Sequence, residues 1–333
     1  MKLASLREGG RDGALVVVDD RLRIAVPVPH IARTLLEALE DWERAEPLLR
    51  RTAASLAGGD LPGVQPLDLT ALASPLPRSH QFLDGSVYLH HMEKARKARG
   101  AAMPPNYHTE PIMYQGLSDA FVGPLEPMAL PDEDHGIDYE PEIAVVVDDV
   151  PMATGVAAAA AHIKLVMLLN DYTLRTLTKT ELPKGFGFLQ AKPTSSFSPV
   201  AVPPSDLGSA WDGERFHLRV RSSVNGVLLG DADAAKDMFF TYPQLIAHAA
   251  RTRRLSAGTI IGAGAISNDA EATGYGCIAE ARIAEEHEHG APRTPWLRFG
   301  DVVRIDAVDR AGRNVFGAIE QHIVPAVAMG ASA

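Results

Sequence analysis

Residues 137–147 read IDYEPEIAVVV, and this apolar run with two glutamates decides the fold around it. The branched apolar residues at its end are typical of a β-strand. Side chains two positions apart on a strand lie on one face, so Glu140 and Glu142 are expected to project side by side. Crowded carboxylates repel one another and are costly to bury, so a buried pair needs a cation. An exposed acidic face on an edge strand, which Pro141 would suit, is the alternative interpretation.

Two more acidic residues stand where they could join this pair. Asp171 follows the apolar run of residues 163–169, and Asp84 precedes His90 and His91 by six and seven residues. Carboxylate oxygens suit a hard cation, so we predict a bound divalent ion, with Mg²⁺ as the first choice and Ca²⁺ or Mn²⁺ as alternatives. An aspartate at the end of a strand is also a common turn residue, which is the other interpretation of Asp171.

Composition and charge limit the class of protein. The chain has 333 residues, of which 46% are hydrophobic and 22% charged, as is ordinary for a globular protein with a sizeable core. Its net charge of −10 argues against a general nucleic-acid surface. Cys277 is the single cysteine, which excludes an internal disulfide and a cysteine-based zinc site. No apolar run reaches the roughly 18 residues of a membrane span, and the N-terminus does not resemble a signal peptide. We therefore expect a cytoplasmic protein without membrane or nucleic-acid partners.

Turn and helix signals divide the chain into two parts. A hairpin is predicted near the N-terminus, and residues 31–56 show the apolar spacing of two short helices, the second opened by Pro47. A glycine- and proline-rich segment at 58–63 precedes a boundary that we place between a small N-terminal α+β domain (1–75) and a larger domain (76–333). Helices do not alternate regularly with strands in the larger part. This favours a mixed, mainly β fold of the α+β class over a doubly wound sheet.

Three basic side chains are candidates for chemistry. Histidine titrates near neutrality, so His91 is a candidate general base, although a histidine pair held by ordinary hydrogen bonds is the alternative. Lys192 follows a glycine-rich aromatic segment and is either an oxyanion-binding group or a solvated loop lysine. Arg175 stands four residues after Asp171 and would share a helical face with it, which a plain ion pair would also explain.

Taken in order, these pieces resemble the motifs of the fumarylacetoacetate hydrolase family. The resemblance covers the chain from about residue 78 to the C-terminus. Its motifs are Asp84 to His91, DYEPE at 138–142, NDYTLR at 170–175, GFLQAK at 187–192, GTIIGAG at 258–264, CIAE at 277–280 and FGDVVRI at 299–305. Each motif is weak alone, and their common order carries the resemblance. The N-terminal part resembles the small domain that such proteins carry.

The resemblance implies a catalytic domain built as a mixed β-sandwich roll, a homodimer, and a divalent metal inside the roll. It implies that the metal ligands are Asp84, Glu140, Glu142 and Asp171. It further implies that His91 activates water and that Glu280 orients His91. Arg175 and Lys192 match groups that hold or polarise the substrate.

The reaction that the resemblance implies is hydrolysis of a carbon–carbon bond in a small diketo acid, such as an acylpyruvate or a fumarylacetoacetate-like compound from aromatic catabolism. Decarboxylation or isomerisation of a related keto acid is the first alternative, and a non-catalytic ligand-binding member is the second. Ser86, Thr178 and Ala265 stand where the animal fumarylacetoacetate enzyme has a tyrosine, a glutamine and a threonine. The metal shell is thus kept and the substrate shell altered, so fumarylacetoacetate itself is not the expected substrate.

Overall fold

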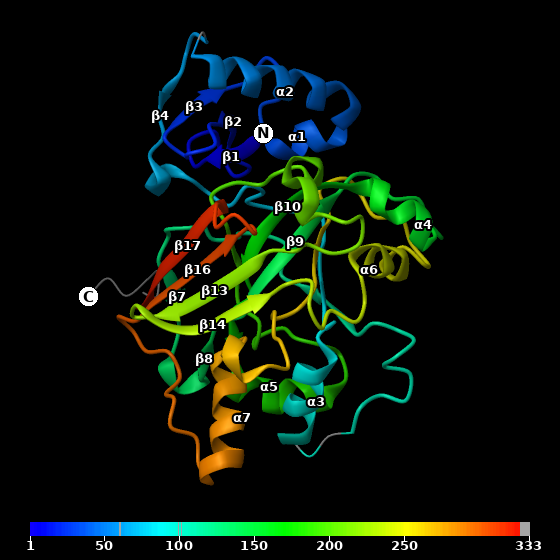
Figure 1. The fold of residues 1–333 in the computed structure, drawn as a ribbon, viewed down its shortest axis with the longest axis vertical. Helices are drawn as coiled ribbons and strands as arrows, with labels where there is room; N and C mark the ends of the chain where they lie inside the picture. The colour runs from blue at the N-terminus through cyan, green and yellow to red at the C-terminus, as the bar shows by residue number, and fades with distance from the viewer. Residues whose placement is uncertain (60, 99, 101, 327–333) are drawn as a thin grey trace, which may run out of the picture.

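The structure, a computed structural model, describes residues 1–59, 61–98, 100 and 102–326. An N-terminal sheet with two helices lies at one end of two larger sheets, and a group of helices lies at the other end (Figure 1). The N-terminal elements are β1 (Lys2–Leu6), β2 (Ala14–Val18), β3 (Ile24–Pro27), α1 (Leu35–Glu40), α2 (Trp42–Gly58), β4 (Gln65–Pro66) and the 3₁₀ turn η1 (Leu69–Ala71). The four strands pair antiparallel in sequence order, which confirms the predicted hairpin as β2 and β3.

A six-stranded sheet forms the centre of the molecule. Its spatial order is β12-β10-β9-β15-β5-β6, and only β15 and β5 run parallel among these pairs of described strands. The strands are β5 (Phe82–Gly85), β6 (Met113–Gly116), β9 (Pro141–Val147), β10 (Ile163–Asn170), β12 (Ser196–Phe197) and β15 (Ile260–Gly262). Neighbours in this sheet come from distant parts of the chain, so the sheet brings together segments that the sequence separates.

A five-stranded sheet packs against the first and has the order β14-β13-β16-β17-β7. Its strands are β7 (Met128–Leu130), β13 (Arg219–Val224), β14 (Val227–Asp233), β16 (Val302–Val308) and β17 (Asn314–Pro325). The remaining elements are β8 (Ile137–Asp138), β11 (Thr173–Leu174), α3 (Leu89–Ala98), α4 (Val156–Ala159), α5 (Arg175–Glu181), α6 (Tyr242–Ala249), α7 (Ile278–His289) and the short 3₁₀ turns η2 (Glu133–His135), η3 (Ala160–His162), η4 (Leu182–Lys184), η5 (Pro204–Ala210) and η6 (Glu271–Thr273). Curled sheets with peripheral helices confirm the mixed, mainly β fold.

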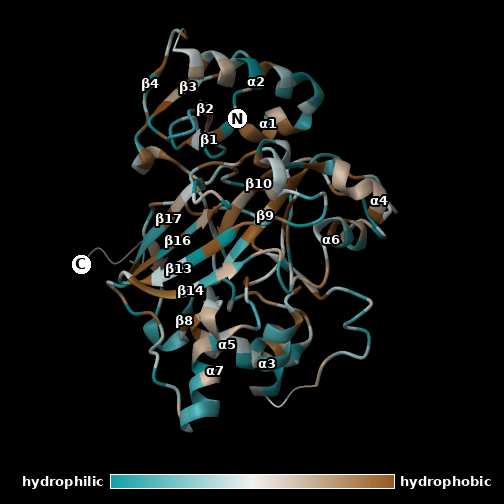
Figure 2. Cartoon of the chain, viewed as in Figure 1, coloured by the Kyte–Doolittle hydropathy of each residue, from teal (hydrophilic) through white to brown (hydrophobic). Residues whose placement is uncertain are grey.

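Strand β9 is buried on both faces, which explains its unbroken run of valines. Ile143 and Val145 belong to the cluster between the two large sheets, whereas Ala144 and Val146 pack with the N-terminal part. Central strands are largely brown in Figure 2, and the free end of α7 is hydrophilic. Because the N-terminal part and the central sheet share one hydrophobic cluster, the division at residue 75 stays a prediction.

The single strand predicted for residues 137–147 is wrong. Those residues form β8, which pairs with β11, and β9, which pairs with β10 and β15. Pro141 has no N–H group, and the break directly before it leaves Glu140 outside both ladders. The side-chain oxygen of Asn170 accepts a hydrogen bond from the N–H of Glu140 at 3.1 Å, so this backbone N–H has a partner although it lies outside the sheet.

The helix prediction at Pro47 is also wrong in detail. Helix α2 begins at Trp42 and continues through Pro47. Proline inside a helix costs roughly 3 kcal/mol. Burial of Trp42, Ala45 and Leu49 from the same helix offsets that cost, so tertiary packing overrides the local signal. Among the helices that the structure describes, none combines the length and the hydrophobicity of a membrane span.

Candidate active site

Three carboxylates meet around the end of β15. Asp84 on β5 and Ala144 on β9 both pair with Gly262, so the side chains of Asp84 and Glu142 flank that glycine. Asp171 directly follows β10, the strand on the other side of β9. Oxygen atoms of Asp84, Glu142 and Asp171 all lie within 4.8 Å of one another. The central sheet thus gathers acidic residues from three separate stretches of sequence.

Gly262 leaves the space that these carboxylates occupy. A Cβ atom at this position would lie 2.3 Å from Asp84 Oδ1 and 2.9 Å from Glu142 Oε2. Real Cβ contacts are not that short, so any larger residue would push both carboxylates away. The nearby N–H of Gly264 donates to Asp84 Oδ1 at 3.1 Å and to Glu142 Oε2 at 3.0 Å, which holds the pair in place.

We expect the Gly262→Ala variant to bind divalent metal at least about tenfold more weakly than the unchanged protein, because Cβ displaces two carboxylates at once. Isothermal titration with Mn²⁺ measures this affinity. Gly155→Ala is the matched control, since a Cβ there meets nothing within 4 Å. Equal Mn²⁺ affinity in the two variants would contradict the prediction that a metal binds between Asp84 and Glu142.

The electrostatics of this cluster call for a cation. Burial, followed by the charge of Asp171, raises the pKa of Asp84 to about 8. Burial and the neighbouring charge of Asp84 raise the pKa of Glu142 well above its ordinary value. Glu142 Oε1 is buried and has no hydrogen-bond partner among the described residues. An orphaned, buried carboxylate oxygen in an all-oxygen group fits a hard divalent cation.

Glu140 faces a different set of partners from Glu142. Its carboxylate accepts hydrogen bonds from Lys192 Nζ at 2.5 Å and from Arg175 at 2.6 Å. Burial alone would raise the pKa of Glu140, but the two cations hold it below its usual range. Glu140 is also near enough to Glu142 for its charge to raise the pKa of that residue, so the expectation that the two glutamates project together stays a prediction. Its role as a fourth metal ligand stays a prediction.

Lys192 is an internal cation rather than a solvated loop lysine. Its side chain is 8% exposed, and Nζ bridges Glu140 Oε2 and Asp171 Oδ2, each at 2.5 Å. Burial would lower the pKa of Lys192, and the two carboxylates outweigh that effect and raise it. Arg175 pairs with Asp138 and Glu140 and does not form the plain ion pair with Asp171 that its spacing permits.

His91 lies on α3 opposite Glu280 on α7. The distance from His91 Nδ1 to Glu280 Oε2 is 3.5 Å, at the long limit of hydrogen bonding, and Nδ1 makes no hydrogen bond within the described chain. Glu280 itself is firmly held, because Ser267 Oγ donates to its carboxylate at 2.8 Å and the N–H of Gly276 donates at 2.8 Å. Burial would raise the pKa of Glu280, yet His91 and these donors lower it to about 2.

Sequence reasoning missed several polar residues of this site. Tyr114 on β6 donates a hydrogen bond to Asp171, and Ser195 donates to the other oxygen of Asp171 at 2.7 Å. Ser267 joins Glu280 to the neighbouring His90, whose Nε2 lies 2.9 Å from Ser267 Oγ. No local pattern marks Tyr114, Ser195 or Ser267, since each acts only through partners far away in the sequence.

A cavity of about 770 Å³ opens beside these groups. Its walls include the candidate site residues Asp84, His91, Glu140, Arg175 and Lys192. They also include Ser86, Thr178 and Ala265, the three positions that the family resemblance predicts to contact the substrate. The volume suits a small organic molecule, and the cations on its wall suit an acidic one.

Residues 81–324 match the family described as Fumarylacetoacetate (FAA) hydrolase C-terminal. The chain belongs to the fumarylacetoacetate hydrolase family. Residues 1–78 also match the accompanying family described as Fumarylacetoacetase N-terminal domain 2. Family members are enzymes that include hydrolases, isomerases and tautomerases.

Similar proteins differ in their reactions. The mitochondrial oxaloacetate tautomerase FAHD2B of Bos taurus is 25% identical over 233 residues, which cover 70% of this chain and 69% of that protein. A putative HpcE protein from Mycobacterium smegmatis has the same fold, with a TM-score of 0.70, 19% identity and coverage of 98% of this chain and 100% of that one. The maleylpyruvate hydrolase of Sphingobium sp. SYK-6, solved with manganese(II) and pyruvate, gives a TM-score of 0.64 at 18% identity over 98% and 100% of the two chains.

Proposed function

We propose that this protein is a metal-dependent hydrolase that cleaves a carbon–carbon bond in a small diketo acid, such as an acylpyruvate. One observation carries the proposal: the cavity that reaches the carboxylate cluster also exposes a histidine backed by an ionised carboxylate. Asp84 lines this cavity on one side, and His91 with Glu280 behind it lies on another. A cation site and a base in one cavity are what hydrolysis of a keto acid requires.

Asp84, Glu142 and Asp171 would hold the cation, with Glu140 as a further candidate ligand. The cation, when bound, supplies Lewis-acid chemistry toward the oxygens of a keto acid, and Mg²⁺ is the proposed ion, with Mn²⁺ and Ca²⁺ as alternatives. Manganese in the related maleylpyruvate hydrolase supports a divalent ion, and the oxygen ligands here fit one.

The chain's own residues would perform the proton transfers. His91 would take a proton from water, whose oxygen adds to the carbonyl carbon farther from the acid group. The bond between that carbon and the neighbouring CH₂ then breaks, the CH₂ carbon keeps the electron pair, and it takes the proton back from His91 to complete the pyruvate product. Glu280 would orient His91, and Lys192 and Arg175 would stabilise negative charge on substrate oxygens.

The family resemblance implies a homodimer, and we include a homodimer in the proposal.

Tautomerisation is the second candidate, because a similar protein is an oxaloacetate tautomerase. That reaction moves a proton between carbon and oxygen and adds no water. His91 could transfer that proton without a hydrogen bond to Glu280. Hydrolysis and tautomerisation would therefore use the same base and differ in whether water enters the product. Decarboxylation and isomerisation, like tautomerisation, would add no water.

We expect acylpyruvates to yield two fragments, pyruvate and a carboxylic acid, in the presence of Mg²⁺ or Mn²⁺ and none in EDTA. Proton NMR of a panel of acylpyruvates, fumarylacetoacetate-like acids and oxaloacetate gives the products. Water labelled with ¹⁸O should leave one heavy oxygen in the carboxylic acid fragment. Release of CO₂, or keto–enol exchange without cleavage, would replace the hydrolase proposal with one of its rivals, and no turnover of any acid would indicate a non-catalytic protein.

A further inference from the structure

Helix α7 has no N-terminal cap of its own. Cys277 occupies the N-cap position with extended backbone angles (φ −160°, ψ 171°), and its side chain accepts no capping hydrogen bond. The first N–H groups of a helix have no partner inside the helix and need an acceptor when they are buried. Ile278, the first residue of α7, is buried. The acceptor must therefore come from another part of the chain.

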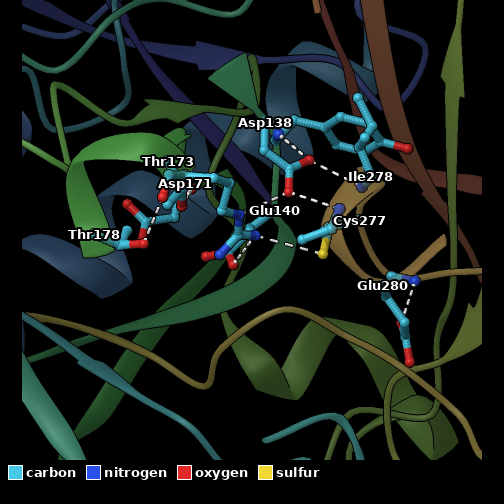
Figure 3. Close-up of polar contacts among 12 residues, drawn as sticks. Asp138, Glu140, Asp171, Thr173, Thr178, Cys277, Ile278 and Glu280 are labelled. Atoms are coloured by element: carbon cyan, nitrogen blue, oxygen red, sulfur yellow. Dashed lines mark hydrogen bonds and ion pairs between the residues drawn. The ribbon is translucent and has the colours of Figure 1, made fainter. Parts of the chain in front are cut away.

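Asp138 on β8 supplies that acceptor. Its Oδ1 accepts from the N–H of Ile278 at 2.9 Å, and its Oδ2 accepts from the N–H of Ala279 at 3.0 Å. In Figure 3, Asp138 faces the beginning of α7 at Cys277 and Ile278. A carboxylate at a helix N-terminus is favourable both through hydrogen bonds and through the helix dipole. Asp138 thus caps a helix that lies 140 residues farther along the chain.

The same carboxylate also binds the first residue of a second helix. Asp138 Oδ2 accepts from Arg175 Nε at 2.8 Å, and Arg175 begins α5. The pairing of Thr173 with Asp138 between β11 and β8 brings the start of α5 to this place. Asp138 is fully buried. Its Oδ1 also accepts from the N–H of Tyr139 at 2.9 Å, so each of the two carboxylate oxygens accepts hydrogen bonds from two N–H groups.

Each of these helices carries a proposed active-site group in its first turn. Glu280, in the first turn of α7, faces His91. Arg175 extends past Asp138 to Glu140 and also lies 3.4 Å from Cys277 Sγ. A shift of either helix would move one of these groups relative to the cavity, and a displacement of about 1 Å can cost about 100-fold in rate.

We propose that Asp138 is a positioning residue that fixes Glu280 through the cap of α7 and Arg175 through a salt bridge. This inference rests on the proposed function for the roles of Glu280 and Arg175, while the capping itself does not depend on the reaction. Asp138 is not among the described residues that line the cavity, so it acts through Glu280 and Arg175, which it holds in place.

Asp138→Asn tests the proposal with almost no change in size. Whichever way the amide points, its NH₂ group faces two N–H donors that the carboxylate now satisfies. We expect amide hydrogen exchange at residues 278–281 to become at least about tenfold faster and kcat to fall roughly 30-fold, with KM raised through Arg175. Asp132→Asn is the matched control, because Asp132 caps a short 3₁₀ turn on the surface, and it should change neither quantity more than about twofold.

Two further variants separate positioning from general destabilisation. Cys277→Ser places a capping hydroxyl on a residue whose backbone is already extended, as N-caps require. In the Asp138→Asn background it should restore slow exchange at residues 278–281 and raise kcat, while KM stays high because Arg175 keeps only one of its two charged partners, Glu140. If Asp138→Asn alone does not fold, this double variant provides the folded background for the same measurements.

A double-mutant cycle with Glu280→Gln completes the test. If Asp138 acts through Glu280, the combined loss in kcat should be smaller than the product of the single losses by at least about fivefold. If the two losses in kcat multiply, the positioning role of Asp138 is overturned. If amide exchange at residues 278–281 is unchanged in Asp138→Asn, the capping role is overturned. Hydrogen exchange reports on the cap even if the protein hydrolyses none of the diketo acids, so failure of this inference and failure of the proposed function are distinguishable.

Discussion

Replacing Glu142 with glutamine should abolish metal-dependent turnover and weaken Mg²⁺ or Mn²⁺ affinity at least about 100-fold. Glu142 is fully buried, its Oε1 is unpartnered among the described residues, and the cluster around it offers two other carboxylates for a cation. Glutamine keeps the shape and removes the charge. The change should therefore act on metal binding and spare the fold.

For the thermal stability of the metal-free Glu142→Gln variant we expect no loss, in contrast to its metal affinity. Burial and Asp84 raise the pKa of Glu142, so its charged form opposes folding at neutral pH in metal-free protein. Glu142→Gln removes that cost and should melt at a temperature equal to or higher than the unchanged protein in EDTA. The unchanged protein should gain about 2.7 kcal/mol when free metal reaches about 100 times its Kd, and the variant should gain almost nothing.

Thermal unfolding with and without metal, together with titration calorimetry, measures both effects. Glu288→Gln is the control, because its side chain is 72% exposed at the free end of α7. Full activity in Glu142→Gln, or equal stabilisation of both proteins by metal, would remove Glu142 from the metal site.

Replacing His91 with alanine should lower kcat about 1,000-fold and leave metal affinity within about twofold of the original value. His91 lies outside the cluster formed by Asp84, Glu142 and Asp171, so its loss removes the base and keeps the cation site. Stopped assays at saturating Mn²⁺, with calorimetry on the same samples, separate the two effects. His80→Ala serves as control, since His80 is half exposed and faces Glu40 on the surface. Near-normal hydrolysis in His91→Ala would assign the base to another residue.

Glu280 adds a pH signature to this prediction. Its pKa lies at about 2, below the ordinary value of 4.5, because His91, Ser267 and Gly276 outweigh the effect of burial. A depressed carboxylate pKa contributes stability that is fully present above the ordinary value and is lost as the pH falls toward 2. Glu280 therefore stays ionised through the neutral range, and an acidic limb of the rate profile near neutral pH must come from another group.

Local patterns were enough to predict the strands of the core and several candidate residues. The valine run of β9 and the apolar run of β10 are readable because every residue except Lys164 faces a buried layer. The order of motifs identified the family correctly and drew attention to Asp84, His91 and Lys192. What failed was local geometry: the strand breaks before Pro141, and helix α2 runs through Pro47.

The partners of the polar residues could not be predicted from the sequence. Lys192 looks like a loop residue until the fold brings it between Glu140 and Asp171. Tyr114, Ser195 and Ser267 have no distinctive spacing, because each of them acts on a residue from another element. Hydrogen bonds and ion pairs of this kind depend on strand order and register, which no single segment contains.

The sequence by itself determined the family through the order of its motifs, and it predicts a cation because carboxylates within apolar strands are costly to bury unpaired. Only the tertiary structure decided the partners of each carboxylate: Asp171 lies in one cluster with Asp84 and Glu142 and also shares Lys192 with Glu140. Residues 138–142 illustrate the division: Asp138 caps α7, Glu140 binds Lys192 and Arg175, and Glu142 joins Asp84. The physical reason is that electrostatic energies fall steeply with distance and burial, and both are set by the packing of segments far apart in the chain.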